Sequence, residues 1–315
     1  MRIERIIVAA AASTALSFFA GCSTSSTVQG GFVARSPVGA TTAIQPAAAQ
    51  TLIYACEFTA NACVWYVHGM NQVAGTLTGL SLPSGVGVDS AGNVYVANFG
   101  AQNVPVYAKG STIVVRTLDD SGHLPVDVKV DPSGTVYVAN LQDINSSSGS
   151  ISVFAPGSAT ITRVIRDPNF GSVTGIAIDE HRELVACYNT ANGGFCDEFV
   201  HARGHGTTVV SNPGAAGMEG VAFDNAGDLA VQSVLTGTQY FTPSFSSCGT
   251  DPVNGEEMYL AFDRSAGDIY KTNTGSFIEE DAYGACSGAT LEKKYDAGLN
   301  GNVPYGVAVD PASRI

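Results

Sequence analysis

Charge is scarce in this sequence, and most of it is negative. Only 14% of the 315 residues are charged, the formal net charge is −13, and Lys and Arg never form a run. A surface that binds phosphates needs clustered basic side chains, so the sequence predicts no nucleic-acid partner. Acidity of this size is typical of a soluble surface outside the cytoplasm, and cation binding is the alternative interpretation.

The motifs of several enzyme classes are also missing. No G-x-S-x-G segment occurs, so a serine hydrolase triad has no support, and no Gly-rich phosphate loop follows a strand. The cysteines lack the C-x-x-C spacing of zinc sites. His201 and His205 in HARGH have the i, i+4 spacing of helical zinc ligands, but their Gly-rich flanks predict a loop.

The first 21 residues have the features of a secretory signal peptide. Two Arg residues precede an apolar stretch from Ile6 to Ala20, which is shorter than the ~20 residues that a membrane-spanning helix needs. The ending Phe19-Ala20-Gly21-Cys22 resembles the bacterial lipobox. This resemblance implies that Cys22 is lipidated and anchors the mature protein firmly in a membrane. Ordinary secretion is the alternative.

Between the signal and the rest of the chain lies a segment with few large apolar residues. Residues 22–50 show no clear hydrophobic period, which is typical of a flexible tether. The sequence therefore predicts a signal peptide at 1–21, the lipidated Cys22 with its linker at 22–50, and one domain at 51–315. We expect an exported monomer that is lipid-anchored to a bacterial cell envelope, at the outer membrane or the cell surface, with an extracytoplasmic domain.

One short sequence recurs along the domain. VDSAGNVYVANFG at 88–100 returns as VDPSGTVYVANLQ at 130–142, and weaker copies follow. Each copy has an apolar strand that ends in Asp, a turn, and further β-rich segments, so each predicts a four-stranded unit. The closing aspartates recur every 39–48 residues, as the blades of a β-propeller do: Asp89, Asp131, Asp179, Asp224, Asp263 and Asp310. We interpret them as turn residues and not as catalytic groups.

The two ends of the domain predict how the ring closes. The domain opens on TLIYACE, CVWYVHG and QVAGTLT, which match the second, third and fourth strands of a blade, and it ends on VPYGVAVDPASRI, a lone first strand. Together these segments make one blade, which gives six with the five internal copies. The sequence thus predicts an all-β, six-bladed β-propeller with four-stranded antiparallel blades, closed by N-terminal strands that pair with the C-terminal strand.

The repeat also carries a family resemblance. The pattern G-V-x-V-D-x-x-G-x-V-Y-V-A-N, followed by V-x-V-Y or I-S-V-F, resembles NHL-repeat propellers. It also resembles the wider six-bladed superfamily of gluconolactonase-type calcium enzymes, over roughly residues 51–315. The resemblance implies the fold and leaves the function open, because this scaffold serves binding, sensing and hydrolysis.

Six cysteines lie within the domain, and an even number suggests disulfides in an exported protein. Two of them occupy the same position of the blade, and each of these is followed closely by another cysteine. The expected pairs are Cys56–Cys63 and Cys187–Cys196, each within one hairpin, and Cys248–Cys286, between blades five and six counted from the composite blade.

Propellers usually bind ligands where the first strands begin and the second strands finish. Register places carboxylate and amide groups there and no cation. The candidate ligand-binding residues are Glu57, Asn98, Asp127, Asn140, Glu219 and Asn273. Glu219 resembles the calcium-binding Glu of gluconolactonase-type enzymes, which implies a Ca²⁺ site of Glu219, Asn140 and Asn273. The alternative is that the Asn side chains bond their own turn backbone.

Three functions are open at this stage. The sequence favours a binding or interaction module whose ligand, a protein, a glycan or a small molecule, is held at this end of the channel. One alternative is a calcium-dependent lactonase or related hydrolase that uses Glu219 as a metal ligand. Another is a purely structural protein of the cell envelope. No catalytic residue is assigned, and calcium is the candidate cofactor.

Overall fold

The computed structural model describes residues 50–214, 217–251, 257–263, 267–284, 286, 288–299 and 301–310. All of them fall within the unit formed by residues 43–315. The expected signal peptide and the lipidation site Cys22 lie outside the described residues. Among the residues that are described, no helix is long and apolar enough to span a membrane.

The repeated turn forms because its first Asp accepts hydrogen bonds from the backbone that follows. Asp89 Oδ1 accepts from the N–H of Asn93 at 2.9 Å. Gly92 takes the left-handed φ of +84° that this turn requires. In the copy that starts at Asp179, where glycine is missing, Arg182 adopts a φ of 67° instead. The aspartates of these turns are structural, as the sequence indicated.

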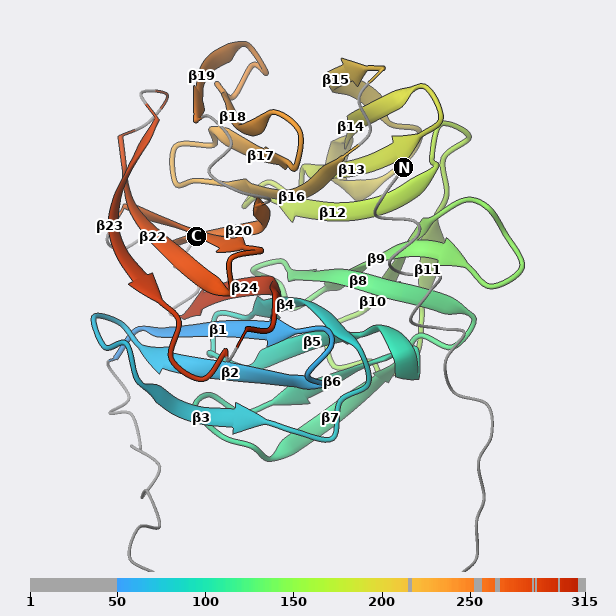
Figure 1. Cartoon of the computed structure of the whole chain (residues 1–315). Coiled ribbons are helices and arrows are strands. Elements are labelled where there is room, and N and C mark those ends of the chain that lie inside the picture. Colours follow the sequence, from blue (N-terminus) through green and yellow to red (C-terminus); the bar gives the residue numbers. More distant parts are fainter. Residues whose placement is uncertain are drawn as a thin grey trace, which may run out of the picture. The chain divides into compact units, whose positions relative to one another are not determined.

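The turns join antiparallel strands into blades of four (Figure 1). Blade one contains, from the innermost strand outward, β24 (Pro304–Asp310), β1 (Leu52–Glu57), β2 (Ala62–Val67) and β3 (Val73–Leu77). Blade two contains β4 (Pro83–Val88), β5 (Val94–Asn98), β6 (Asn103–Tyr107) and β7 (Val114–Asp119). Blade three contains β8 (His123–Val130), β9 (Val136–Asp143), β10 (Ser150–Phe154) and β11 (Arg163–Ile165).

The second half of the ring repeats this order. Blade four contains β12 (Ser172–Ile178), β13 (Leu184–Thr190), β14 (Gly193–Phe199) and β15 (Thr207–Pro213). Blade five contains β16 (Met218–Phe223), β17 (Leu229–Ser233), β18 (Gly237–Phe241) and β19 (Ser247–Asp251). Blade six contains β20 (Glu257–Asp263), β21 (Asp268–Asn273), β22 (Phe277–Tyr283) and β23 (Ala289–Tyr295).

The ring closes in blade one, where the last strand pairs with the first. β24 lies antiparallel to β1, with Leu52 opposite Asp310 and Cys56 opposite Gly306. In Figure 1 the red and blue ends of the colour scale meet at this pair. The prediction of six four-stranded blades closed by the two ends of the domain is confirmed.

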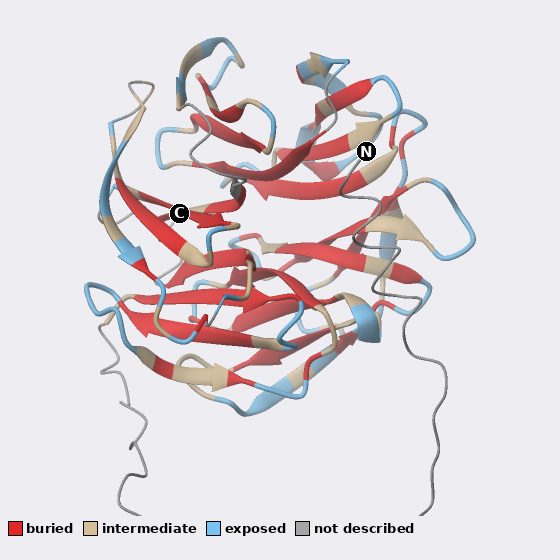
Figure 2. Ribbon diagram, viewed as in Figure 1, coloured by how far each residue is buried: buried red, intermediate tan, exposed pale blue. Residues whose placement is uncertain are grey.

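The blades pack face to face through apolar side chains. The cluster between blades one and two, for example, includes Tyr54, Trp65 and Val86, all of which are buried. The innermost strands are largely buried, whereas outer strands such as β7 and β23 are mostly exposed (Figure 2). The core is therefore shared among the interfaces between blades, and it holds the innermost strands in place around the channel.

The cysteines pair as expected from the sequence. The three disulfides are Cys56–Cys63, Cys187–Cys196 and Cys248–Cys286. The first two link directly opposed residues of the β1–β2 and β13–β14 hairpins. The third joins β19 of blade five to the segment between β22 and β23 of blade six. Three disulfides are consistent with a protein outside the cytoplasm.

Candidate functional site at the channel mouth

The innermost strands share one irregularity at the end where they begin. In every blade the pairing register with the second strand shifts there by a β-bulge. The shifted positions include Ser84, Thr174, Glu219 and Tyr305. A bulge re-aims side chains away from the alternation of a regular strand. This end of the ring therefore presents side chains that regular strands would not bring together.

The innermost strands also approach one another closely at this end. A Cβ atom on Gly175 would lie 2.2 Å from the carbonyl oxygen of Glu219, and one on Gly220 would lie 2.7 Å from Cα of Tyr259. Only glycine leaves room for such contact between strands of neighbouring blades. The glycines that open the repeated segments GIAID and GVAFD thus narrow the channel mouth.

Tyr259 crosses the narrowed mouth. This buried side chain starts in blade six, and its hydroxyl donates to the carbonyl oxygens of Thr174 at 2.8 Å and Val126 at 3.3 Å, in blades four and three. Burial raises the pKa of Tyr259 well above its usual value, and the carboxylates of Asp127 and Glu219 add to the rise. The hydroxyl therefore stays protonated as a hydrogen-bond donor. In the sequence nothing singles out Tyr259, which opens the strand segment YLAFD.

Asp127, one of the predicted site residues, ties two blades together at the mouth. Its Oδ1 accepts from Lys129 Nζ at 2.7 Å, and its Oδ2 accepts from the N–H of Ile176 in blade four at 3.1 Å. Burial raises the pKa of Asp127, and Lys129 offsets part of this rise. All of these interactions are made within the protein, so Asp127 holds the mouth in shape.

Unlike Asp127, Glu219 has a carboxyl that is not held by hydrogen bonds from the described part of the chain. Only 6% of the residue is exposed, and its carboxyl makes no hydrogen bond among the described residues. Burial alone raises the pKa of Glu219 to about 8. The side chain is therefore mostly a neutral acid at pH 7, beside the hydroxyl of Tyr259.

The raised pKa of Glu219 predicts how stability depends on pH. Below about pH 4.5 the carboxyl is protonated in both the folded and the unfolded chain. Between about 4.5 and 8 only the unfolded chain loses the proton, so folding becomes less favourable as the pH rises. Relative to wild type, the free energy of unfolding of Glu219→Gln should rise across this window, by up to about 1.4 kcal/mol per pH unit.

Urea unfolding of both proteins at several pH values measures this difference. Glu180→Gln, which removes an exposed carboxylate of blade four, is the control. A wild-type-to-variant difference that stays constant from about pH 5 to about pH 8 would contradict a protonated Glu219.

Two of the predicted Asn residues accept hydrogen bonds from backbone N–H groups. Asn98 Oδ1 accepts from the N–H of Ser81 at 2.7 Å, and its Nδ2 donates to Asn103 Oδ1 at 2.9 Å. Asn273 Oδ1 accepts from the N–H of Gly275 at 2.8 Å. The contact of Asn273 is of the kind expected when an Asn that closes a strand bonds its own turn, whereas Asn98 bonds the backbone of the segment before β4.

Asn140 belongs to a buried polar cluster in blade three. Its Nδ2 donates to Ser152 Oγ at 2.9 Å, and its Oδ1 has no partner. In the same cluster His123 Nδ1 lies 2.6 Å from Asp143 Oδ1, to which Ser150 also donates. Ser150 is fully buried and bonds the carboxylate directly, so this group is no accessible nucleophile of the Ser-His-Asp type. The sequence showed no signal for it.

Glu57 is the remaining predicted residue. It is buried at the end of β1, and its Oε2 has no hydrogen-bond partner. Burial raises the pKa of Glu57, and the side chain of Asn302 offsets part of the rise. Among the described residues, the carboxylates of Asp127 and Glu219 both act electrostatically on Tyr259, and no hydrogen bond joins Glu219 to Asn140 or Asn273.

Further along the innermost strands the channel holds a cavity of about 120 Å³. Its lining is apolar and comes from all six blades, with residues such as Val86, Ile178 and Phe262. Among the described lining residues Lys129 alone is charged, and it already pairs with Asp127. The cavity therefore offers little polar recognition, which leaves the mouth beside Tyr259 as the candidate site.

The histidines of HARGH do not share a site. His201 lies in the short 3-10 turn Val200–Ala202, and its Nδ1 is 3.2 Å from Glu183. His205 Nδ1 is 3.4 Å from Asp167. The segment is a loop, as predicted, and its histidines contact different carboxylates.

No protein-family model matches the chain, and no curated protein matches it. Solved structures match in fold. A chain of the nidogen/laminin complex aligns with a TM-score of 0.66 at 12% identity, over 82% of this chain and 98% of that chain. A chain of Kuenenia stuttgartiensis hydrazine synthase aligns with a TM-score of 0.58 at 15% identity, over 73% of this chain and 72% of that chain.

A third solved structure is that of a gluconolactonase from Xanthomonas campestris. It aligns with a TM-score of 0.52 at 17% identity, over 71% of this chain and 83% of that chain. At identities this low the likeness shows a shared propeller fold and no common function.

Proposed function

We propose that this chain is an exported, membrane-tethered binding module of the NHL-like kind, with Cys22 as its lipid anchor. Its ligand is held at the end of the ring where the innermost strands begin. The three disulfides support export, because such bonds persist in oxidising compartments. Because Tyr259 crosses the mouth, the ligand lies on this end surface and does not pass through the channel.

The observation that carries the proposal is the carboxyl of Glu219, a residue that is only 6% exposed and whose side chain makes no hydrogen bond to the described residues. A largely buried carboxyl without a partner inside the protein is open to a ligand that supplies one. As a neutral acid, Glu219 offers one donor and one acceptor. A ligand rich in hydroxyl or amide groups fits this site: a glycan, a peptide segment of a protein, or a polar small molecule.

The test is a thermal-shift screen of the purified mature protein against glycans and polar small molecules, followed by titration of each hit. We expect Glu219→Ala to weaken binding by about 10-fold or more, which corresponds to about 1.4 kcal/mol. Glu180→Ala, a change of an exposed carboxylate in blade four, should leave the affinity unchanged. A ligand that binds Glu219→Ala as tightly as wild type would place the site elsewhere.

A calcium-dependent lactonase is the second candidate, and the fold shared with a gluconolactonase favours it. Asn140 Oδ1 is buried and lacks a donor, and the side chain of Glu219 makes no hydrogen bond to the described residues, whereas Asn273 Oδ1 already accepts from Gly275. Ca²⁺ bound by these oxygens would hold Glu219 ionised. Lactone hydrolysis that is lost both with chelator and in Glu219→Ala would favour the enzyme. The absence of hydrolysis and of calorimetric heat with Ca²⁺ would favour the binding module.

A further inference from the structure

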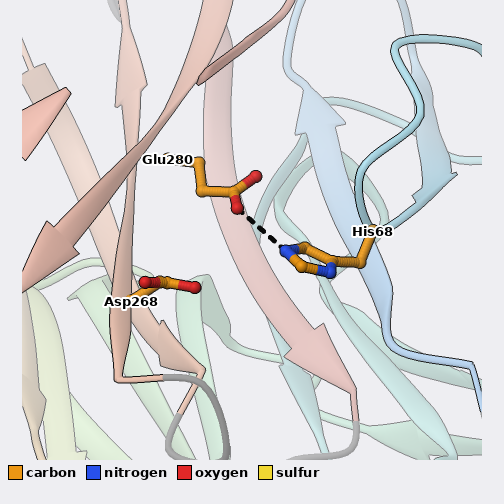
Figure 3. A group of neighbouring side chains, drawn as sticks. All are labelled: His68, Asp268 and Glu280. Atoms are coloured by element: carbon orange, nitrogen blue, oxygen red, sulfur yellow. Dashed lines mark hydrogen bonds and ion pairs between the residues drawn. The ribbon is translucent and has the colours of Figure 1, made fainter. Parts of the chain in front are cut away.

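The seam that closes the ring brings together a histidine and two carboxylates from blades one and six. His68 follows β2 of blade one, whereas Asp268 and Glu280 lie on β21 and β22 of blade six (Figure 3). One ligand atom of each residue lies within 4.8 Å of those of the other two. No sequence motif joins these residues, because His68 lies some 200 positions before the other two.

In this group the carboxylate of Glu280 is buried, whereas the side chain of His68 is partly exposed to solvent. Glu280 has only 6% of its side chain exposed, and its Oε1 lies 2.8 Å from Nε2 of His68. The hydroxyl of Tyr295 donates to the other oxygen, Oε2. His68 has 38% of its side chain exposed, so an ion from solvent can reach the group. Asp268 makes no hydrogen bond through its side chain among the described residues.

A separate observation, the hydroxyl of Tyr270, points to a ligand at this group. The hydroxyl of Tyr270 has no hydrogen-bond partner, although the residue is fully buried. Tyr270 is directly opposite Glu280 in the β21–β22 pairing, and Asp268 is two residues before it on the same strand. All three side chains therefore lie on one face of blade six. A buried tyrosine hydroxyl normally finds a partner, so this one, unpaired among the described residues, is a free donor on the face that carries Asp268 and Glu280.

The electrostatics of the seam favour a cation. The carboxylates of Asp263 and Glu292 are close enough to act on Asp268, and together with Glu280 they make the surroundings acidic. Lys293 is the positive group at the edge, where its Nζ donates to the carbonyl of Gly69. Its Nζ is thus engaged away from Asp268 and Glu280, for which no ion pair with a lysine is found among the described residues.

We propose that His68, Asp268 and Glu280 bind a divalent transition-metal ion such as Zn²⁺, with water as the fourth ligand and Tyr270 as its hydrogen-bond partner. An imidazole nitrogen with carboxylate oxygens suits Zn²⁺, whereas Ca²⁺ takes six to eight oxygens. The metal takes the place of the proton between His68 Nε2 and Glu280 Oε1, and this proton is released to solvent. Two ligand atoms at ~2.0–2.1 Å from a tetrahedral zinc lie ~3.3 Å from each other. The distance between His68 Nε2 and Glu280 Oε1, now 2.8 Å, therefore needs to increase only slightly.

The ion would cross-link the two blades at which the ring closes. It would join blade one to blade six, whose ligands are separated by some 200 residues of chain. A ligand that binds only the folded state stabilises it in proportion to the logarithm of its concentration. The site is independent of the channel mouth, so the two proposals stand or fall separately.

The test is calorimetric titration of Zn²⁺ into the chelator-treated, disulfide-intact protein. We expect one ion per chain. His68→Gln and Asp268→Asn should each weaken binding at least about 10-fold, and Tyr270→Phe about 10-fold, which is the range for a partner outside the ligand shell. His181→Gln, which alters a histidine that is 74% exposed in blade four, should leave binding unchanged.

A second measurement keeps the proposal testable if a variant is unstable. Zn²⁺ should raise the Tm of wild type and of His181→Gln, and should leave the Tm of His68→Gln unchanged; because His68 is partly exposed, that variant keeps its fold. Absence of Zn²⁺ heat in wild type at millimolar ion would overturn the proposal. So would Zn²⁺ binding that is equal in wild type, His68→Gln and Asp268→Asn, or Ca²⁺ binding that is as strong at the same residues.

Discussion

Replacing Tyr259 by alanine is expected to lower the free energy of unfolding by about 3–5 kcal/mol, as large buried aromatic side chains generally do. The side chain is buried and crosses from blade six to the carbonyl groups of Val126 and Thr174. Alanine leaves a cavity at the channel mouth and removes the donor of both carbonyl oxygens. Denaturant unfolding followed by the fluorescence of Trp65, the single Trp, measures the loss.

Two matched substitutions separate the cavity from the hydroxyl. Tyr259→Phe keeps the ring and removes the donor, so we expect a loss of about 1–3 kcal/mol from the unsatisfied carbonyl groups. Tyr107→Phe removes the hydroxyl of another buried tyrosine, which makes no hydrogen bond among the described residues, and should cost less than about 0.5 kcal/mol. Equal losses in the two phenylalanine variants would contradict a special role for the Tyr259 hydroxyl.

Removal of the Cys248–Cys286 disulfide is expected to lower the free energy of unfolding by about 4 kcal/mol. In the chain-entropy model a cross-link stabilises by restricting the unfolded chain, and more so for longer loops. This bond spans 38 residues, whereas Cys56–Cys63 spans 7. The double variant Cys248→Ala/Cys286→Ala, compared with wild type in urea, measures the effect.

The short hairpin disulfide is the internal control for that prediction. Cys56→Ala/Cys63→Ala should cost about 2.5 kcal/mol, because its loop is much shorter. Reductant also opens Cys187–Cys196, so treated wild type should lose more free energy of unfolding than the sum of the two double variants. A smaller loss at Cys248–Cys286 than at Cys56–Cys63 would show that loop entropy does not dominate in this ring.

Local repetition explains how much of the fold could be predicted. Each Asp and its turn glycine act within a few residues, so Asp89 and Gly92 revealed the blade from sequence alone. The lone strand at 306–310 indicated the closing pair with β1, and the spacing of the cysteines indicated the disulfides. These features depend on chain-local chemistry or on simple counting of copies.

The site depended on contacts that no local pattern encodes. Register placed Glu219 and Asp127 at the channel mouth, but only the bulges bring Tyr259 across to Thr174. The amide of Asn273 has the residue type of a ligand and accepts from its own turn instead. The group of His68 and Glu280 exists because the ring closes, and its members are too distant in sequence for any motif to join them.

The innermost strand of blade one, β24, comes from the far end of the domain, so blade one cannot be completed until this strand has been synthesised. Until residues 304–310 have been made, β1 presents a row of unpaired N–H and C=O groups. Such a row can pair with a strand from a neighbouring copy. We therefore expect chains that still lack β24 to associate more readily than complete chains. The seven residues of β24 cover this edge of β1 once they have been made, and they thereby close the ring.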